Sequence, residues 1–218
     1  MNFTEIGAPQ RSELWYAARA GRVTGSRAAD VLAKIKSGEA AARRDYRAQL
    51  VCERLTGAPQ EDTFVNAAMQ RGIDLEPMAR AALEARQGYL IRESGFLSCT
   101  EAMVGCSLDG DVDGYKGIVE LKCPKSATHL RYWREGSVPS EHLPQILHNL
   151  LVTDAHWCDF ASYDDRFPES MRLWVRRVTV KDVAAELLNY RGNLAAFLDE
   201  VSREVEAVRE LAAVEQLR

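Results

Sequence analysis

The chain has 218 residues, of which 46% are hydrophobic and 28% are charged, and its formal net charge is −4 at pH 7. This length and composition predict one domain, 1–218. The acidic balance lacks the basic footprint of a typical nucleic-acid-binding protein, so any DNA contact must come from a local patch. We expect no membrane association, because no apolar run is long enough to span a bilayer and the first residues do not resemble a signal peptide.

The cysteines and histidines form no metal-binding pattern. The five cysteines include no C-x-x-C pair, which favours reduced thiols in a cytoplasmic protein. Of the four histidines, His142 and His148 are too far apart for an H-E-x-x-H zinc site. Each histidine is therefore expected to be an ordinary core or surface residue.

The first helical region, residues 10–35, is interrupted. Two helices are predicted, broken near Gly21 to Gly25, with Ser26 as the N-cap of the second. A helix N-terminus with hydroxyls and arginines can bind an anion, although a solvated turn between helices also fits the pattern. The side chains gathered at this break are Arg19, Arg22, Thr24, Ser26 and Arg27.

Two further helices are predicted, over 40–56 and 64–87, and each is followed by a glycine, a common C-terminal signal. The N-terminal helical part of the chain thus spans about 10–56. Pro77 is expected to kink the second of these helices or to start a new turn, with Glu76 directly before it. Three arginines in the helix predicted over 40–56 form either a solvated face or, if the protein binds DNA, a face that contacts the phosphates: Arg43, Arg44 and Arg47.

Strand patterns dominate the middle of the chain. Strands are predicted over 89–92, 96–98, 103–106, 118–121, 157–163 and 173–178, with helices over 128–135 and 140–153. A long amphipathic stretch from about Lys181 to Gln216 then either packs on the domain or makes a subunit contact. This order predicts an α/β or α+β protein with a mixed central sheet flanked by helices.

The strands predicted over 103–106 and 118–121 flank a turn rich in Asp and Gly, which is typical of a hairpin. Side chains alternate along a strand, so Glu120 and Lys122 share one face. A closed hairpin would bring Asp109 near Glu120. Two carboxylates can hold Mg²⁺, and a lysine beside them can orient or deprotonate the attacking water, as phosphodiester hydrolysis requires.

The same segment fits a second kind of site, the calcium loop of an EF-hand. An EF-hand needs a helix on each side of the loop, whereas 104–107 is a poor helix and Pro124 follows almost at once. Lys116 also stands where such loops usually have a buried aliphatic residue. A non-enzymatic calcium-binding module remains an alternative, as does a plain surface hairpin. The residues that match the loop are Asp109, Asp111, Asp113, Gly114 and Glu120.

The chain carries, in this order, Glu76 in a predicted helix, Asp109, Glu120-Leu121-Lys122 and a helical Gln145. This arrangement resembles the PD-(D/E)xK nuclease superfamily and, more closely, the lambda-type phage alkaline exonucleases, also called YqaJ-like viral recombinases. Two positions depart from the family pattern: Leu108 replaces a proline that often precedes the first aspartate, and His142 stands where relatives often have tyrosine. The matching motifs are Trp15 with Arg19 and Thr24-Gly25-Ser26, Gly72 with Glu76, Cys106-Ser107-Leu108-Asp109, Glu120-Leu121-Lys122-Cys123-Pro124, Gln145, and Tyr163-Asp164 with Arg166.

The resemblance implies a restriction-endonuclease-like core with a two-metal site. Asp109, Glu120 and the main-chain carbonyl of Leu121 would bind catalytic Mg²⁺. Glu76 would help to hold a second ion or its waters. Mn²⁺ is expected to substitute for Mg²⁺, and Ca²⁺ is expected to occupy the site and inhibit.

The resemblance also assigns roles to residues that bind the substrate. Lys122 would position or activate the attacking water, and Gln145 would orient that water or contact the phosphate. A pocket that grips the terminal 5′-phosphate near the metal site would impose 5′→3′ direction. The residues implied for this pocket are Arg19, Thr24, Ser26 and Ser107.

The implied activity is 5′→3′ digestion of one strand of linear double-stranded DNA, which leaves a 3′ tail for recombination by strand annealing. The family further implies a homotrimeric ring around DNA and a phage single-strand annealing protein as partner, in the cytoplasm of a bacterium that carries a phage or prophage. An endonuclease of restriction or repair type is the alternative within the superfamily, and it would cut closed circular DNA.

Overall fold

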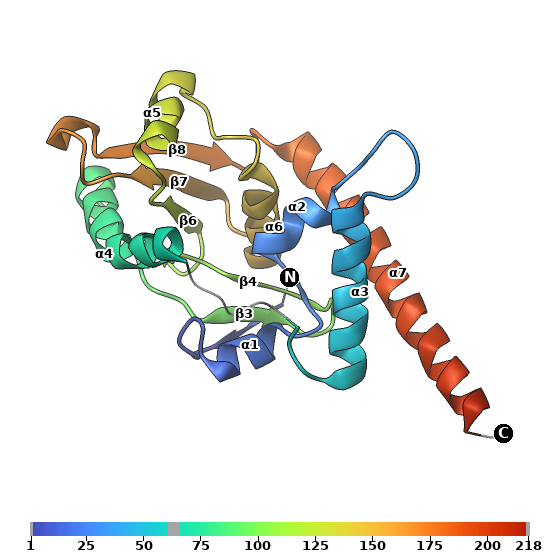
Figure 1. Cartoon of the computed structure of the whole chain (residues 1–218). Helices are drawn as coiled ribbons and strands as arrows, with labels where there is room; N and C mark the ends of the chain where they lie inside the picture. Colours follow the sequence, from blue (N-terminus) through green and yellow to red (C-terminus); the bar gives the residue numbers. More distant parts are fainter. Residues whose placement is uncertain (1, 61–65, 217–218) are drawn as a thin grey trace.

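The computed structural model describes residues 2–60 and 66–216, which form two four-stranded sheets with helices packed around them (Figure 1). The strand order is β1-β3-β4-β2 in the first sheet and β5-β6-β7-β8 in the second. Each sheet contains one parallel pair, so both are mixed. The α+β class predicted from the order of elements is confirmed, but two sheets stand in place of one central sheet.

The first sheet is built from short strands of the N-terminal half. β1 runs antiparallel to β3, β3 antiparallel to β4, and β2 parallel to β4, with Val23 opposite Val104. The sheet therefore brings the segment after the first helix beside the strand that leads to Asp109. The strands are β1 (Thr4–Ile6), β2 (Val23–Thr24), β3 (Phe96–Cys99) and β4 (Val104–Ser107).

The second sheet carries the longest strands. β5 and β6 form a hairpin, β6 and β7 are parallel, and β7 and β8 are antiparallel. A parallel pair needs a crossover, and here two helices, α5 (Ser126–Glu135) and α6 (Leu143–Thr153), connect β6 to β7. The strands are β5 (Gly110–Val112), β6 (Gly117–Lys122), β7 (Trp157–Tyr163) and β8 (Leu173–Thr179).

The other helices follow the predicted pattern, although residues 64 and 65 of the predicted helix 64–87 lie outside the described residues. The helices over 41–56 and 67–87 end where Gly57 and Gly88 adopt left-handed φ values of 68° and 74°. The second of these helices continues through Pro77. The elements are α1 (Glu13–Arg19), a 3₁₀ turn (Gly25–Arg27), α2 (Ala28–Val31), α3 (Ala41–Thr56), α4 (Ala67–Gln87), a second 3₁₀ turn (Glu169–Met171) and α7 (Ala184–Glu215).

Two apolar clusters sandwich the second sheet. On one side α4 packs Leu75, Ala79 and Leu83 against Val119 and Leu121 of β6. On the other side α6 contributes Ile146, Leu147 and Leu150 to a cluster that contains Ile118 and Phe160. Because side chains alternate along β6, Glu120 and Lys122 share the face of Ile118 and point away from the α4 cluster.

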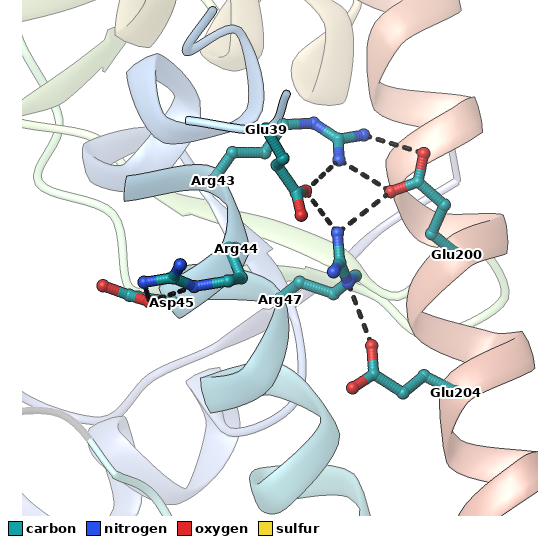
Figure 2. Close-up of polar contacts among 7 residues, drawn as sticks. All are labelled: Glu39, Arg43, Arg44, Asp45, Arg47, Glu200 and Glu204. Carbon is teal, nitrogen blue, oxygen red and sulfur yellow. Dashed lines mark hydrogen bonds and ion pairs between the residues drawn. The ribbon is translucent and has the colours of Figure 1, made fainter. Parts of the chain in front are cut away.

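The terminal helix α7 is joined to α3 by ion pairs (Figure 2). Arg43 donates to both carboxylate oxygens of Glu200, at 2.7 and 2.9 Å, and Arg47 donates to Glu204 at 2.9 Å. Glu39 pairs with both arginines. Two of the three arginines considered as a phosphate-tracking face are therefore engaged with α7, and exposed Arg44 pairs with its neighbour Asp45.

Packing accounts for the first two thirds of α7. Its buried residues recur on the side that faces the core, and the last of them is Val205. Beyond that point the described residues of α7 are exposed, and the helix extends past the rest of the chain (Figure 1). Among the described residues, no helix is long and apolar enough to cross a bilayer.

Three sequence predictions of local structure are wrong in detail. The predicted hairpin partner of β6 is β5, whereas the segment 103–106 belongs to β4 in the other sheet. The predicted strand 89–92 is reduced to one bridge, between Arg92 and Asp111. Ser26 lies within the 3₁₀ turn whose N-cap is Thr24, so it caps no helix.

Candidate active site

The crossing from one sheet to the other places Asp109 beside β6. Asp109 lies between β4 and β5, and its Oδ2 accepts a hydrogen bond from the main-chain N–H of Leu121 at 2.6 Å. Lys122 pairs with Oε1 of Glu120, which is only 1% exposed. The structure thus brings Asp109, Glu120 and Lys122 together at the end of β6, although the connection differs from the predicted hairpin.

The electrostatics of this cluster favour a cation. Burial raises the pKa of Glu120. The positive charge of Lys122 lowers this pKa and the negative charge of Asp109 raises it, so the net pKa is raised. Burial also raises the pKa of Asp109. Burial lowers the pKa of Lys122, but the charges of Glu120 and Asp109 outweigh it, so its net pKa is raised. Two desolvated carboxylates that share one lysine would be stabilised by a further positive charge.

Glu76 reaches the same place from α4. Burial is the main cause that raises the pKa of Glu76, and the negative charge of Asp109 raises it further, whereas the positive charge of Arg80 lowers it. Arg80 donates to Glu76 Oε1 at 2.9 Å. Glu76 and Asp109 line an open cavity of about 540 Å³ between α4 and the N-terminal segment, with Pro77, Arg80 and Leu108 also in its wall. The site is therefore accessible from solvent on this side.

The donor set fits Mg²⁺ better than a metal that needs a full cage of side chains. Asp109, Glu120 and the carbonyl of Leu121 are hard oxygen donors, and Mg²⁺ is commonly bound by one or two carboxylates and several waters. Within residues 2–60 and 66–216, no three His, Cys, Asp or Glu side chains form a group able to hold a metal ion. A site here would thus depend on the main-chain carbonyl and on water.

A second cluster lies in the turn 21–27. The guanidinium of Arg19 is buried, with Nη2 3.4 Å from both Thr24 Oγ1 and Ser26 Oγ. It also stacks over the ring of Trp15, 4.1 Å from the ring centroid. Trp15 Nε1 donates to Ser107 Oγ at 2.9 Å, which joins this cluster to the end of β4. Ser107 is two residues before Asp109, so the two clusters adjoin.

Two residues of α3 that the sequence analysis did not select hold this turn. Tyr46, which is 1% exposed, accepts a hydrogen bond from the main-chain N–H of Thr24 at 3.1 Å. Buried Glu53 accepts from the N–H of Gly21 at 2.6 Å. Tyr46 and Glu53 are seven residues apart and thus share a helix face, but no sequence signal connects that face with the turn.

The face of α6 that meets the site carries Gln145 and Asn149. A Cβ placed on Gly25 would lie 3.6 Å from Gln145 Cγ, so Gln145 borders the turn 21–27. Asn149, one helical turn later, has Nδ2 3.4 Å from Glu120 Oε2. Sequence reasoning missed Asn149, although the spacing of four residues from Gln145 places both on one face.

The late motif around Asp164 lies beside the site and shapes it. Fully buried Asp164 accepts hydrogen bonds from Arg166, Ser126 and Arg71. Burial raises the pKa of Asp164, but the hydrogen bonds from Arg166 and Ser126 and the charge of Arg166 outweigh it and lower the pKa well below its usual range. This carboxylate ties the end of β7 to the starts of α4 and α5, and so fixes the loop after Lys122.

His142 lies close enough to Lys122 to be affected by its charge. It precedes α6, and its Nε2 lies 3.0 Å from the hydroxyl of Tyr132. Burial lowers the pKa of His142 to about 4, and the positive charge of Lys122 contributes. The imidazole is therefore neutral at physiological pH, and its hydrogen bond with Tyr132 can form without a competing charge.

The calcium-loop interpretation does not fit the structure. The segment from 109 to 120 is a strand, a turn and part of a second strand, whereas an EF-hand has helices on both sides. Its aspartates also diverge, because Asp111 pairs with Arg92 and Asp113 pairs with Lys116. These side chains do not enclose one ion.

The fold and the site define a mixed α+β protein in which a cluster of buried carboxylates adjoins a turn that surrounds a buried arginine. Residues 14–156 match the family model of the YqaJ-like viral recombinase domain. That match covers more than half of the chain, and the chain belongs to the YqaJ-like viral recombinase family. A comparison with curated proteins gave no match.

Solved structures support this assignment. The alkaline exonuclease LHK-Exo from Laribacter hongkongensis is 39% identical, with a TM-score of 0.80 over 93% of this chain and 98% of that chain. The same enzyme in complex with dAMP gives a TM-score of 0.81 at the same identity and coverage. A phage-related exonuclease from Haemophilus somnus is 13% identical, with a TM-score of 0.62 over 87% and 96% of the two chains, and is similar in fold alone.

Proposed function

We propose that this protein is a Mg²⁺-dependent 5′→3′ exonuclease that digests one strand of linear double-stranded DNA and leaves a 3′ single-stranded tail. The family and the alkaline exonucleases that share its fold support a nuclease. The observation that carries the proposal is the adjacency of the two clusters. Asp109 follows Ser107 by two residues, and Ser107 is hydrogen-bonded to the tryptophan on which Arg19 stacks.

This adjacency suits removal of nucleotides from a 5′ end. Two residues of extended chain span at most about 7 Å, so Ser107 lies within that distance of Asp109, and a phosphate bound in the pocket that Ser107 borders would belong to the same strand end as a phosphodiester at Asp109. Arg19, Thr24, Ser26 and Ser107 would bind the terminal 5′-phosphate through charge and hydroxyl hydrogen bonds. The anion site would then select the end, and its distance from Asp109 would select the bond.

The chemical step would take place at the end of β6. Asp109, Glu120 and the carbonyl of Leu121 would hold Mg²⁺, with Glu76 toward a second ion; bound Mg²⁺ supplies a water of lowered pKa and stabilises charge on the phosphate. Lys122, which stays protonated beside two carboxylates, would position the attacking water and offset negative charge. Gln145, on the bordering face of α6, would orient that water or contact the phosphate.

Strand annealing would complete the function. A 3′ tail is a substrate for an annealing protein, so a phage single-strand annealing protein is the partner we propose, in a bacterial cytoplasm. A homotrimeric ring would retain the remaining strand, and a basic channel wall is compatible with a net charge of −4 for the chain. We expect Mn²⁺ to substitute for Mg²⁺, and Ca²⁺ to occupy the site and inhibit.

Digestion of end-labelled DNA tests the proposal. A linear duplex labelled at either the 5′ or the 3′ end is incubated beside a closed circle with Mg²⁺, Mn²⁺, Ca²⁺ or no metal. We expect rapid release of the 5′ label with Mg²⁺ or Mn²⁺ and an intact circle. Cutting of the circle would favour an endonuclease of restriction or repair type, and absence of cleavage with every metal would overturn the nuclease assignment.

A further inference from the structure

We propose that Asn149 is a positioning residue that holds the Glu120 carboxylate and sets its place relative to the turn 21–27. This inference rests on the proposed nuclease function and adds a residue to its site. Asn149 is 1% exposed, and its Nδ2 lies 3.4 Å from Glu120 Oε2. The other oxygen, Oε1, is held by Lys122. Each oxygen of Glu120 therefore has its own donor.

The orientation of the Asn149 amide follows from electrostatics. If the amide were reversed, its oxygen would face the Glu120 carboxylate, and two acceptors would repel each other in a desolvated site. Nδ2 therefore faces Glu120. The Oδ1 atom is left buried without a hydrogen-bond partner among the described residues, a costly arrangement that native proteins retain only for a reason.

The reason lies on the other side of the amide. An ideal Cβ on Gly25 would be 2.4 Å from Asn149 Oδ1, closer than two such atoms can approach. Gly25 does not adopt a positive φ, so the glycine is required for space and not for backbone conformation. The Asn149 amide thus fills the gap between Glu120 and the turn that carries Thr24 and Ser26.

Asn149 consequently links the two halves of the proposed site. A shift of the turn 21–27 toward α6 pushes the amide against Glu120, and loss of the amide frees both sides. Outer-shell residues that orient a ligating carboxylate typically contribute about 10- to 100-fold to metal affinity or activity. We infer an effect of this kind on Mg²⁺ affinity and on the use of the 5′-phosphate.

The first test compares Asn149→Leu with a control on the same helix. Leucine keeps the branched skeleton of asparagine, with the same number of side-chain heavy atoms, but cannot donate to Glu120. The control is Thr153→Val, because Thr153 is also buried in α6 and its hydroxyl bonds only to nearby main-chain groups among the residues that the structure describes. Binding of Mg²⁺ to the DNA-free protein is measured by calorimetry, and the half-saturating Mg²⁺ concentration, kcat and KM are measured well below both melting temperatures.

We expect Asn149→Leu to weaken Mg²⁺ binding by about tenfold or more, with Thr153→Val unchanged in this property even where its Tm falls. A role in packing alone would lower the Tm of both variants and leave Mg²⁺ binding unaltered, and that result would overturn the proposal. Failure of the wild-type protein to digest DNA would instead count against the proposed function. The calorimetric comparison measures Mg²⁺ binding without DNA and does not depend on that activity.

A second test keeps the proposal falsifiable if Asn149→Leu does not fold. Gly25→Ala introduces the clash with Oδ1, and Asn149→Ala removes the atom that clashes. We expect Gly25→Ala alone to reduce kcat and the preference for 5′-phosphorylated ends, and the double variant to be no worse than Asn149→Ala. Additive losses in the double variant would show that the two residues act independently and would overturn the proposed coupling.

Discussion

The main-chain N–H of Leu121 donates to Oδ2 of Asp109 at 2.6 Å, which fixes one carboxylate of the candidate site to the strand that carries the other. Asp109 belongs to the crossing between the two sheets, whereas Leu121 lies in β6 between Glu120 and Lys122. Because the donor is a main-chain group, the place of Asp109 depends on the strand and not on the leucine side chain. The spacing of the two carboxylates is thus built into the backbone.

Replacement of the Asp109 carboxylate should lower the cleavage rate without lowering the stability of the fold. Asp109→Asn removes a proposed metal ligand, and we expect the cleavage rate to fall roughly 1,000-fold or more, since a catalytic metal provides several kcal/mol of charge stabilisation. Burial raises the pKa of Asp109, so its ionised form is unfavourable in the metal-free protein. The Tm of Asp109→Asn in a chelating buffer should therefore equal or exceed that of the wild type.

Asp113, in the turn of the adjoining β5–β6 hairpin, offers a matched control. It is exposed and pairs with Lys116 in the turn, away from the candidate site. Asp113→Asn should leave both the rate and the Tm nearly unchanged. A cleavage rate of Asp109→Asn within tenfold of the wild type would remove Asp109 from the metal site.

Arg19 should determine the preference for 5′-phosphorylated ends. Its buried guanidinium contacts Thr24 and Ser26, and stacking on Trp15 fixes its plane. Arg19→Lys keeps the charge but loses the planar fork and the stacking, so we expect it to restore only part of the preference that Arg19→Ala abolishes. The ratio of initial rates on 5′-phosphate and 5′-hydroxyl duplexes measures this effect.

Exposed Arg44, which pairs only with Asp45 among the described residues, provides the control for charge. Arg44→Gln lowers the charge of the protein by the same amount as Arg19→Ala. We expect it to slow digestion of both substrates equally or not at all. An unchanged substrate ratio in Arg19→Ala would refute the anion pocket.

The ion pairs between α3 and α7 should stabilise the docking of the terminal helix. Arg43 makes two hydrogen bonds to Glu200, and both side chains are partly buried (Figure 2). A double-mutant cycle with Arg43→Met and Glu200→Gln should give a coupling free energy of about 1 kcal/mol that falls as salt is raised. Denaturant unfolding at low and high salt measures it, and a coupling near zero at low salt would contradict the prediction.

The sequence predicted much of this structure because many of its signals are local. The glycines that end α3 and α4 lie where a left-handed residue closes a helix, and the strand over 157–163 is rich in apolar and aromatic residues. The alternation along β6 also correctly placed Glu120 and Lys122 on one face. These features depend only on neighbouring residues.

The features that sequence could not provide are contacts between distant segments. Two apolar runs around an Asp-Gly turn resemble a hairpin, and nothing local shows that β4 pairs with β2 and β3 instead of β6. Tyr46, Glu53 and Asn149 likewise act through partners far along the chain, at Thr24, Gly21 and Glu120. A helix pattern shows that such residues face inward but not what they meet.

The buried His148 should make the protein less stable in mild acid. Its Nε2–H donates to the carbonyl of Gly105 at 2.9 Å, and its Nδ1 accepts from the hydroxyl of Tyr190 at 2.7 Å, so the neutral ring satisfies both contacts. Burial lowers the pKa of His148 to about 4. The unfolded chain, with an ordinary pKa of about 6.5, therefore binds a proton at pH values where the folded protein does not.

This difference in proton binding makes the free energy of unfolding fall as the pH is lowered. Above about pH 6.5 the contribution of His148 to stability is complete, and between about 6.5 and 4 the free energy of unfolding falls by up to about 1.4 kcal/mol per pH unit. His142, whose pKa is also lowered to about 4, acts in the same direction. His148→Gln should thus be less stable at pH 7.5 but lose less stability on acidification to pH 5. Urea unfolding of the wild type and of His148→Gln at both pH values gives the loss of unfolding free energy in each protein, and contributions common to both cancel in the comparison. An equal loss in the two proteins would show that His148 is not the group responsible.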